Sequence, residues 1–153
     1  MTIQSPKIKT AKILAISISE KKGVKKANVQ KVELKDDFGI IGDAHAGADV
    51  RQVSLLAEES IEKMRQKGLN VNPGDFAENI TTQNLDLLRL KIGDRLKIGQ
   101  DVILEISQIG KECHTRCNIY YQAGDCVMPR EGVFASVLNG GIIKVGDKIE
   151  VYG

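Results

Sequence analysis

Residues 91–98, with the sequence Lys-Ile-Gly-Asp-Arg-Leu-Lys-Ile, decide the fold class of this chain. The same arrangement returns at residues 144–151 as Lys-Val-Gly-Asp-Lys-Ile-Glu-Val, and in both a Gly-Asp turn leads into alternating apolar and polar residues. Glycine before aspartate suits tight turns with positive φ, and the alternation is typical of a strand with one buried face. Further Gly-Asp pairs lie at positions 42–43, 74–75 and 124–125. The sequence therefore predicts a mainly β, barrel-like or sandwich-like domain.

One segment, residues 57–67, predicts a clear helix among these strands. Its apolar residues recur at helical spacing, and Gly68 follows where a glycine that ends a helix belongs. One short helical turn is expected at 85–90, and the apolar run 131–138 is consistent with either a helix or a strand. The predicted strands cover residues 13–19, 28–34, 51–56, 78–81, 95–98, 102–107 and 148–151.

Composition indicates a globular chain of one domain, residues 1–153. The sequence has 22 Lys and Arg against 20 Asp and Glu, a net charge of +2, which gives no reason to expect a nucleic-acid footprint. No apolar run approaches the roughly 18 residues of a membrane span, and residues 1–12 lack the apolar core of a signal peptide. We therefore expect a cytoplasmic protein that binds neither nucleic acid nor membrane.

The three cysteines, Cys113, Cys117 and Cys126, are concentrated in one segment, which indicates a site rather than a disulfide framework. Together with His114 they could provide four zinc ligands, but the spacing supports zinc only weakly because no second ligand module is present. A neighbouring cation such as Lys111 would instead favour a thiolate, which could act as a nucleophile, a soft-metal ligand or a sulfur acceptor. Core packing is the ordinary role of any single free cysteine.

Two glycine-containing segments carry other candidate residues. In Gly42–Gly47, Asp43 could hold the imidazole of His45 in one tautomer against a ligand, whereas the alternative is a turn with an exposed histidine. In Pro73–Asn79, two carboxylates, an amide and an aromatic ring could bind a polar ligand or position a water, whereas the alternative is a Pro-Gly turn that leads into a strand. The residues concerned are Asp75, Phe76, Glu78 and Asn79.

Basic side chains lie beside these segments at Arg51, Lys111 and Arg130. The planar guanidinium of arginine suits phosphate or carboxylate ligands, although a single surface arginine is usually a solvated charge. No glycine-rich phosphate loop of the nucleotide-hydrolysing or dinucleotide-binding type is present. The sequence therefore gives no support to nucleotide hydrolysis or hydride transfer.

Taken together, the segments resemble the MOSC domain family, whose members occur at the C-terminus of molybdenum cofactor sulfurases and as small stand-alone proteins. The resemblance covers about residues 10–152, which we take as the core of the domain. It implies a mostly β, barrel-like fold with a cleft, and a role in molybdenum cofactor chemistry or sulfur transfer. The motifs that carry it, in order, are Gly42–Gly47, Arg51–Val53, Pro73–Ile80, Ile92–Leu96, Cys113–His114 and Met128–Phe134.

For individual residues, the resemblance centres on Cys113, which would act as the catalytic group by carrying sulfur, or as a metal ligand by binding molybdenum through its thiolate. We expect the candidate residues to converge on one cleft, because barrel rims gather functional groups from strand ends and turns. The roles of Cys117 and Cys126 are not fixed by the resemblance. The expected cofactor-binding residues are His45, Arg51, Asp75, Phe76, Glu78, Asn79, Lys111, His114 and Arg130.

Three functions are open at this point. The first is a module that binds the molybdenum cofactor (molybdopterin) and assists its sulfuration, carriage or insertion. The second is a persulfide carrier without cofactor, and the third is a molybdenum-dependent reductase of N-hydroxylated compounds, which would need an external electron donor because the cysteine spacing fits no iron–sulfur pattern. Expected partners are a sulfur donor such as a cysteine desulfurase, and a molybdoenzyme or cofactor-biosynthesis protein. No lysine that would bind pyridoxal phosphate is identifiable.

Overall fold

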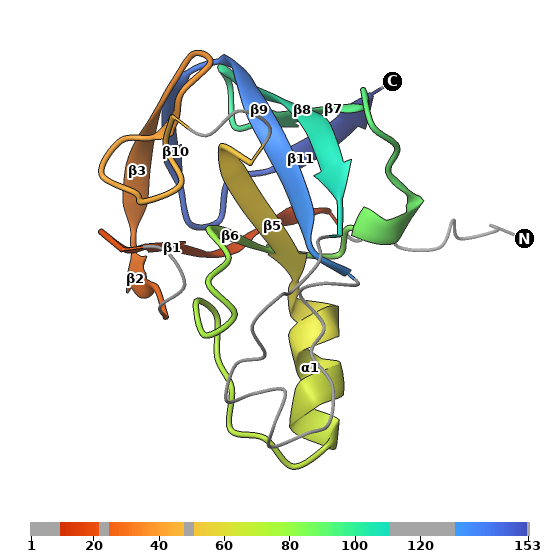
Figure 1. Cartoon of the computed structure of the whole chain (residues 1–153). Coiled ribbons are helices and arrows are strands. Elements are labelled where there is room, and N and C mark those ends of the chain that lie inside the picture. The colour runs from red at the N-terminus through yellow and green to blue at the C-terminus, as the bar shows by residue number, and fades with distance from the viewer. Residues whose placement is uncertain (1–9, 22–24, 48–50, 111–130, 153) are drawn as a thin grey trace, which may run out of the picture.

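The structure, a computed structural model, describes residues 10–21, 25–47, 51–110 and 131–152 (Figure 1). These residues form eleven strands, one α-helix and one 3₁₀ turn. The elements in chain order are β1 (Lys12–Ile18), β2 (Ala27–Val29), β3 (Lys31–Lys35), β4 (Gly39–Ile40), β5 (Val53–Ala57), α1 (Glu58–Gln66), β6 (Ile80–Gln83), η1 (Leu87–Arg89), β7 (Arg95–Ile98), β8 (Val102–Ile109), β9 (Val133–Asn139), β10 (Gly141–Lys144) and β11 (Ile149–Tyr152).

The larger of two sheets has eight strands in the order β11-β7-β8-β9-β5-β6-β1-β2, and the smaller has the order β10-β3-β4. All pairings are antiparallel except that of β5 with β6, which is parallel. The chain passes from β5 to β6 through α1. A bridge between Lys12 and Lys148 brings β1 to β11, and Ile13 N donates to Asp147 O at 2.9 Å. The prediction of a mainly β fold is confirmed, but the described strands curl toward a barrel without closing it.

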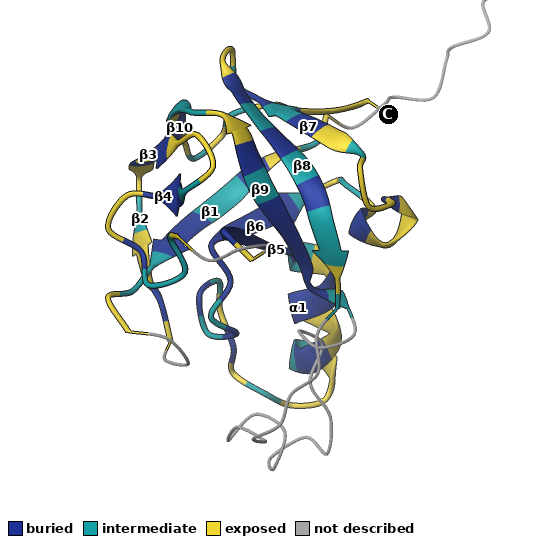
Figure 2. Cartoon of the chain, turned by 45° about the horizontal axis from the view of Figure 1, so that its top comes forward, coloured by how far each residue is buried: buried dark blue, intermediate teal, exposed yellow. Residues whose placement is uncertain are grey.

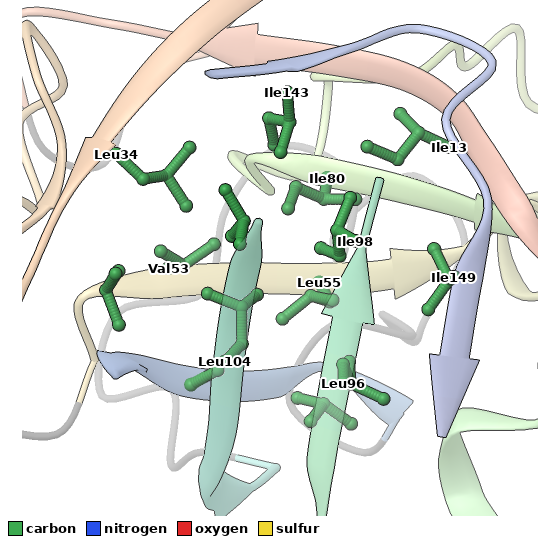
Figure 3. Packing of buried hydrophobic residues seen from close by; sticks show 14 of the residues in the cluster. Ile13, Leu34, Val53, Leu55, Ile80, Leu96, Ile98, Leu104, Ile143 and Ile149 are labelled. Atoms are coloured by element: carbon green, nitrogen blue, oxygen red, sulfur yellow. The ribbon is translucent and has the colours of Figure 1, made fainter. Parts of the chain in front are cut away.

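The core lies between the two sheets. Leu34 from β3 and Ile143 from β10 point toward Ile98 and Leu104 of the large sheet (Figure 3), and all four side chains are buried. A second cluster packs α1 against the large sheet and consists of Leu56, Ile61, Met64, Val71, Phe76 and Phe134. Every residue of β5 is buried, and β9 is buried through most of its length but exposed at its last two residues, whereas the yellow, exposed segments lie mainly in the connections (Figure 2).

The predicted helix over residues 57–67 is confirmed as α1. Ala57 is its N-cap with extended φ and ψ, Glu58 and Glu59 lie favourably in the first turn, and Gly68 follows the C-cap with a φ of +91°. Ile61 and Met64 are buried and fix the helix against the sheet. No helix of the described residues is long and apolar enough to cross a membrane.

The structure corrects one predicted strand and decides one segment that the sequence left open. The single strand predicted over 28–34 is wrong, because the chain bends at Gln30 and passes from one sheet to the other, with β2 pairing with β1 and β3 pairing with β10. The alternation inside β3 is as expected, since Val32 and Leu34 are buried between exposed residues. The ambiguous run 131–138 forms strand β9. The other predicted strands and the helical turn η1 occur with small shifts at their ends.

Candidate functional site

The segment Gly42–Gly47 places Asp43 in the interior and leaves His45 partly exposed. Asp43 Oδ2 accepts a hydrogen bond from His45 N at 3.0 Å, and the His45 Nδ1 atom lies 3.6 Å from the same oxygen. Asp43 Oδ1 accepts from Ser19 N at 3.1 Å and from Lys26 Nζ at 2.7 Å. The carboxylate therefore connects the end of β1, the residue before β2 and the histidine turn.

The charges in this group are almost completely withdrawn from water. The side chains of Lys26 and Asp43 are both 0% exposed, whereas that of His45 is 19% exposed. Burial would raise the pKa of the Asp43 carboxyl, but hydrogen bonds from His45, Lys26 and Ser19 outweigh burial and hold the pKa well below its usual range. Asp43 is therefore ionised at neutral pH and is paired with a buried ammonium group.

The segment Pro73–Asn79 is a tight turn that leads into β6. Gly74 has a φ of +95°, and its N–H donates to Glu78 Oε1 at 3.0 Å. Thr81 Oγ1 donates to Glu78 Oε2 at 3.3 Å. Burial raises the pKa of the Glu78 carboxyl to about 7, against the opposing effect of backbone donors at Glu78, Gly74 and Phe76. Glu78 thus holds the turn from inside and titrates near neutral pH.

Asn79 links the turn to the large sheet. Its Oδ1 accepts hydrogen bonds from Ser54 N at 3.0 Å and from Ser54 Oγ at 3.1 Å. Its Nδ2 donates to Ser17 O at 3.1 Å, and its backbone carbonyl accepts from Ser17 N at 2.7 Å. These bonds make the buried Asn79 amide a connection between β5 and β1, while its proposed contact with a cofactor stays a prediction.

The two segments meet at Lys26. Its N–H donates to Gly74 O at 2.9 Å, while its ammonium group reaches Asp43 in the other segment. His45, Glu78 and Asn79, which were predicted to share a site, therefore belong to one connected polar network. Sequence reasoning missed Lys26 and Ser54. Lys26 is one of several lysines in a basic loop, and nothing in the local sequence distinguishes the buried one.

The side chains of three other candidates, Arg51, Phe76 and Asp75, make their described contacts outside this network. Arg51 is exposed, its Nε donates to Gln108 Oε1 at 3.1 Å, and its guanidinium lies 5.4 Å from the centre of the Phe134 ring. Phe76 is buried in the same apolar cluster as Phe134. Asp75 Oδ2 accepts from the backbone N–H of residue 72 at 2.9 Å and so stabilises the turn. Ligand contacts of these residues stay predictions.

Four candidate site residues fall outside the described residues: Lys111, Cys113, His114 and Arg130. So do Cys117 and Cys126. Within the part of the chain that the structure describes, no group of three or more His, Cys, Asp or Glu side chains is arranged to hold a metal ion. A cavity of about 350 Å³ lies between α1 and residues 84–88 and includes Glu131, but none of the predicted site residues lines it.

The fold and the network define a mainly β protein whose strand ends carry a buried, charged hydrogen-bond cluster. The model of the MOSC domain family matches residues 42–150, and the chain belongs to this family. No curated protein matches the sequence.

Solved structures support the fold. The YuaD protein from Bacillus subtilis superimposes with a TM-score of 0.79 at 21% identity, covering 95% of this chain and 98% of that protein. YiiM from Geobacillus stearothermophilus gives 0.68 at 17% identity, covering 94% of this chain and 75% of that protein. YiiM from Escherichia coli gives 0.62 at 19% identity, covering 93% and 70%. At these identities the likeness concerns the fold alone.

Proposed function

We propose that this protein binds the molybdenum cofactor and assists its sulfuration, carriage or insertion, with the thiolate of Cys113 as the reactive group. Support comes from membership of the MOSC family over residues 42–150, a range that includes Cys113. The observation that carries the proposal is the His45 imidazole. One ring edge lies buried beside Asp43, the residue is partly exposed, and the same network includes the second family segment, Pro73–Asn79.

The chemistry of the described residues fits an anionic cofactor that bears a phosphate and a polar heterocycle. The Asp43 carboxylate is neutralised by Lys26, so its charge would not repel an anion. Arg51 presents an exposed guanidinium of the kind that binds phosphate in a bidentate manner. His45 Nδ1 is buried 3.6 Å from Asp43 Oδ2, too far for a hydrogen bond within the described residues, and the residue is still partly exposed.

A close approach of two loops shapes this region. A Cβ atom on Gly39 would lie 2.8 Å from the carbonyl oxygen of Gln52 and 3.3 Å from Cα of Ala46, so only glycine lets the histidine turn pack against the start of β5. Gly47 N donates to Phe38 O at 2.7 Å and holds the turn there. The histidine turn is therefore held close to Gln52, the residue that follows Arg51 in the chain.

The proposed roles divide between binding and sulfur chemistry. When bound, the cofactor would supply the metal centre and the position that accepts sulfur. Arg51 would bind the phosphate, His45 would hydrogen-bond the cofactor, and Cys113 would provide the thiolate. To load sulfur, this thiolate attacks the terminal sulfur of a persulfide on a donor protein such as a cysteine desulfurase. A persulfide forms on Cys113 and the donor leaves as a thiolate, with no net oxidation or reduction.

The test uses the wild type together with Cys113→Ser and the control Cys117→Ser, all purified from a host that makes the cofactor. We expect molybdenum and pterin to copurify with the wild type and with Cys117→Ser, and to be lost from Cys113→Ser. After incubation with a cysteine desulfurase and cysteine, mass spectrometry should find one added sulfur atom on Cys113. Molybdenum binding that is equal in all three proteins would exclude Cys113 as the ligand. A persulfide without any bound molybdenum or pterin would instead establish the cofactor-free sulfur carrier.

A further inference from the structure

Lys26 is the one buried lysine among the lysines that the structure describes. Its Nζ donates to Asp43 Oδ1 at 2.7 Å and to Ser19 Oγ at 3.0 Å, and its side chain is 0% exposed. The neighbouring Lys25 is exposed. The fold therefore buries one lysine ammonium group and provides two oxygen acceptors for it.

Stability alone does not account for the buried pair. Transfer of two charges from water to a protein interior carries a desolvation penalty that their attraction often fails to repay, and apolar replacements of such pairs are often as stable. A role in fixing geometry is the better explanation for the pair of Lys26 and Asp43, because each partner has several defined bonds to separate segments. Lys26 contacts Gly74 through its backbone and Asp43 through its side chain.

The geometry at Asp43 determines how His45 is held. Lys26 Nζ and Ser19 N occupy Oδ1, which leaves Oδ2 directed at His45 N and at His45 Nδ1. An ionised carboxylate only accepts hydrogen bonds, so the ring nitrogen that faces it is stabilised when it carries the proton. The second ring nitrogen, Nε2, then carries the lone pair on the opposite edge of the ring.

We propose that Lys26 is a positioning residue: by locking the Asp43 carboxylate, it keeps His45 as the Nδ1–H tautomer, with Nε2 presented to the ligand as a hydrogen-bond acceptor. Without the ammonium group, Asp43 Oδ1 keeps only the longer bond from Ser19 N, so the carboxylate can tilt and Oδ2 is no longer fixed opposite the imidazole. The inference deepens the proposed function and rests on it only for the identity of the ligand, since the tautomer is a property of the unloaded protein.

The test measures the ¹⁵N chemical shifts of the imidazole nitrogens in the unloaded protein at a pH where histidine is neutral. The chain has two histidines, and His114→Gln assigns the signals. We expect a single Nδ1–H tautomer of His45 in the wild type and in the control Lys25→Met, and a mixture of both tautomers in Lys26→Met. Lys26→Gln, which is neutral and shorter but still polar, should also give a mixture and serves if Lys26→Met does not fold. Lys26→Arg, which keeps the charge, should restore the single tautomer.

The outcomes separate positioning from mere packing. If Lys26→Met and Lys26→Gln lose stability but keep the Nδ1–H tautomer, or if Lys25→Met shifts it equally, Lys26 does not position His45. Molybdenum content, measured on the same variants from a cofactor-replete host, should fall in Lys26→Met and remain at the wild-type level in Lys25→Met. A tautomer shift in a protein that never binds molybdenum would overturn the proposed cofactor and leave the role of Lys26 intact.

Discussion

Replacement of Glu78 by glutamine is expected to remove a pH-dependent loss of stability. The Glu78 carboxyl is completely buried, and burial raises its pKa from 4.5 to about 7. Glutamine has nearly the same shape and keeps an oxygen that can accept the bond from Gly74 N, but it has no charge to desolvate. The substitution therefore isolates the cost of ionising this one buried group.

The size and direction follow from the two pKa values. Below pH 4.5 the folded and unfolded chains both hold the proton, and the stabilising contribution of the protonated Glu78 is fully present. As the pH rises, the unfolded chain releases its proton first, and the contribution is lost progressively until the pH passes about 7. A difference of 2.5 pKa units, which is 7 minus 4.5, corresponds to roughly 3 kcal/mol.

The assay is urea denaturation of the wild type and Glu78→Gln between pH 5 and pH 8, followed by circular dichroism. Asp43 does not interfere, because its contribution is present above its unfolded pKa of 3.8 and is lost only at lower pH. We expect the wild type to lose stability relative to the variant by up to about 3 kcal/mol across this range. A difference between the two proteins that is the same at pH 5 and at pH 8 would refute the reasoning.

Two further substitutions test the turn and its connection to the sheet, both by urea denaturation at constant pH. Asn79→Ala should destabilise the protein by roughly 3 kcal/mol, because it leaves the buried Ser54 N–H and Ser17 carbonyl without these partners, at about 1–3 kcal/mol each. The control Asn70→Ala, at an exposed position, should change the stability little. Similar losses of stability in both variants would argue against the network. Gly74→Ala should cost at least twice as much as Gly68→Ala. Both glycines have positive φ and share a strain of roughly 1–2 kcal/mol, but only at Gly74 would the new Cβ collide, with the carbonyl oxygen of Lys26; equal losses would contradict that contact.

Much of the fold could be predicted from the local sequence, because turn glycines and the spacing of apolar residues depend on neighbouring residues alone. The Gly-Asp turn before Arg95 and the alternation after it predicted β7 with its observed bounds. The spacing of Ile61 and Met64 with Gly68 predicted α1. Periodicity failed at Gln30, since a strand that passes from one sheet to another keeps its alternation while its pairing partners change. Sheet membership depends on distant strands, which no local pattern records.

The site could be predicted from the sequence only where its interacting residues lie close together in the chain. The motif of Asp43 and His45 indicated an imidazole held by a carboxylate, and the structure places these groups together. Phe76 lies in the apolar cluster, a position that its short polar segment did not indicate, and its expected contact with a cofactor stays a prediction. Lys26 could not be found from sequence, because a buried lysine and an exposed one differ only in their tertiary partners.

The topology explains why the Pro73–Asn79 turn lies far from the start of β5 in the sequence and beside it in space. Strands β5 and β6 are parallel, so the chain must return to the same end of the sheet before it enters β6, and it does so through α1 and the turn at Gly74. This return places Asn79, which precedes β6, beside Ser54 near the start of β5. Parallel pairing therefore brings the start of β6 beside the start of β5, with Ile80 opposite Leu55. The crossover connection through α1 therefore separates Ser54 from Asn79 in the sequence and returns Asn79 to Ser54 in space, where the two side chains are hydrogen-bonded.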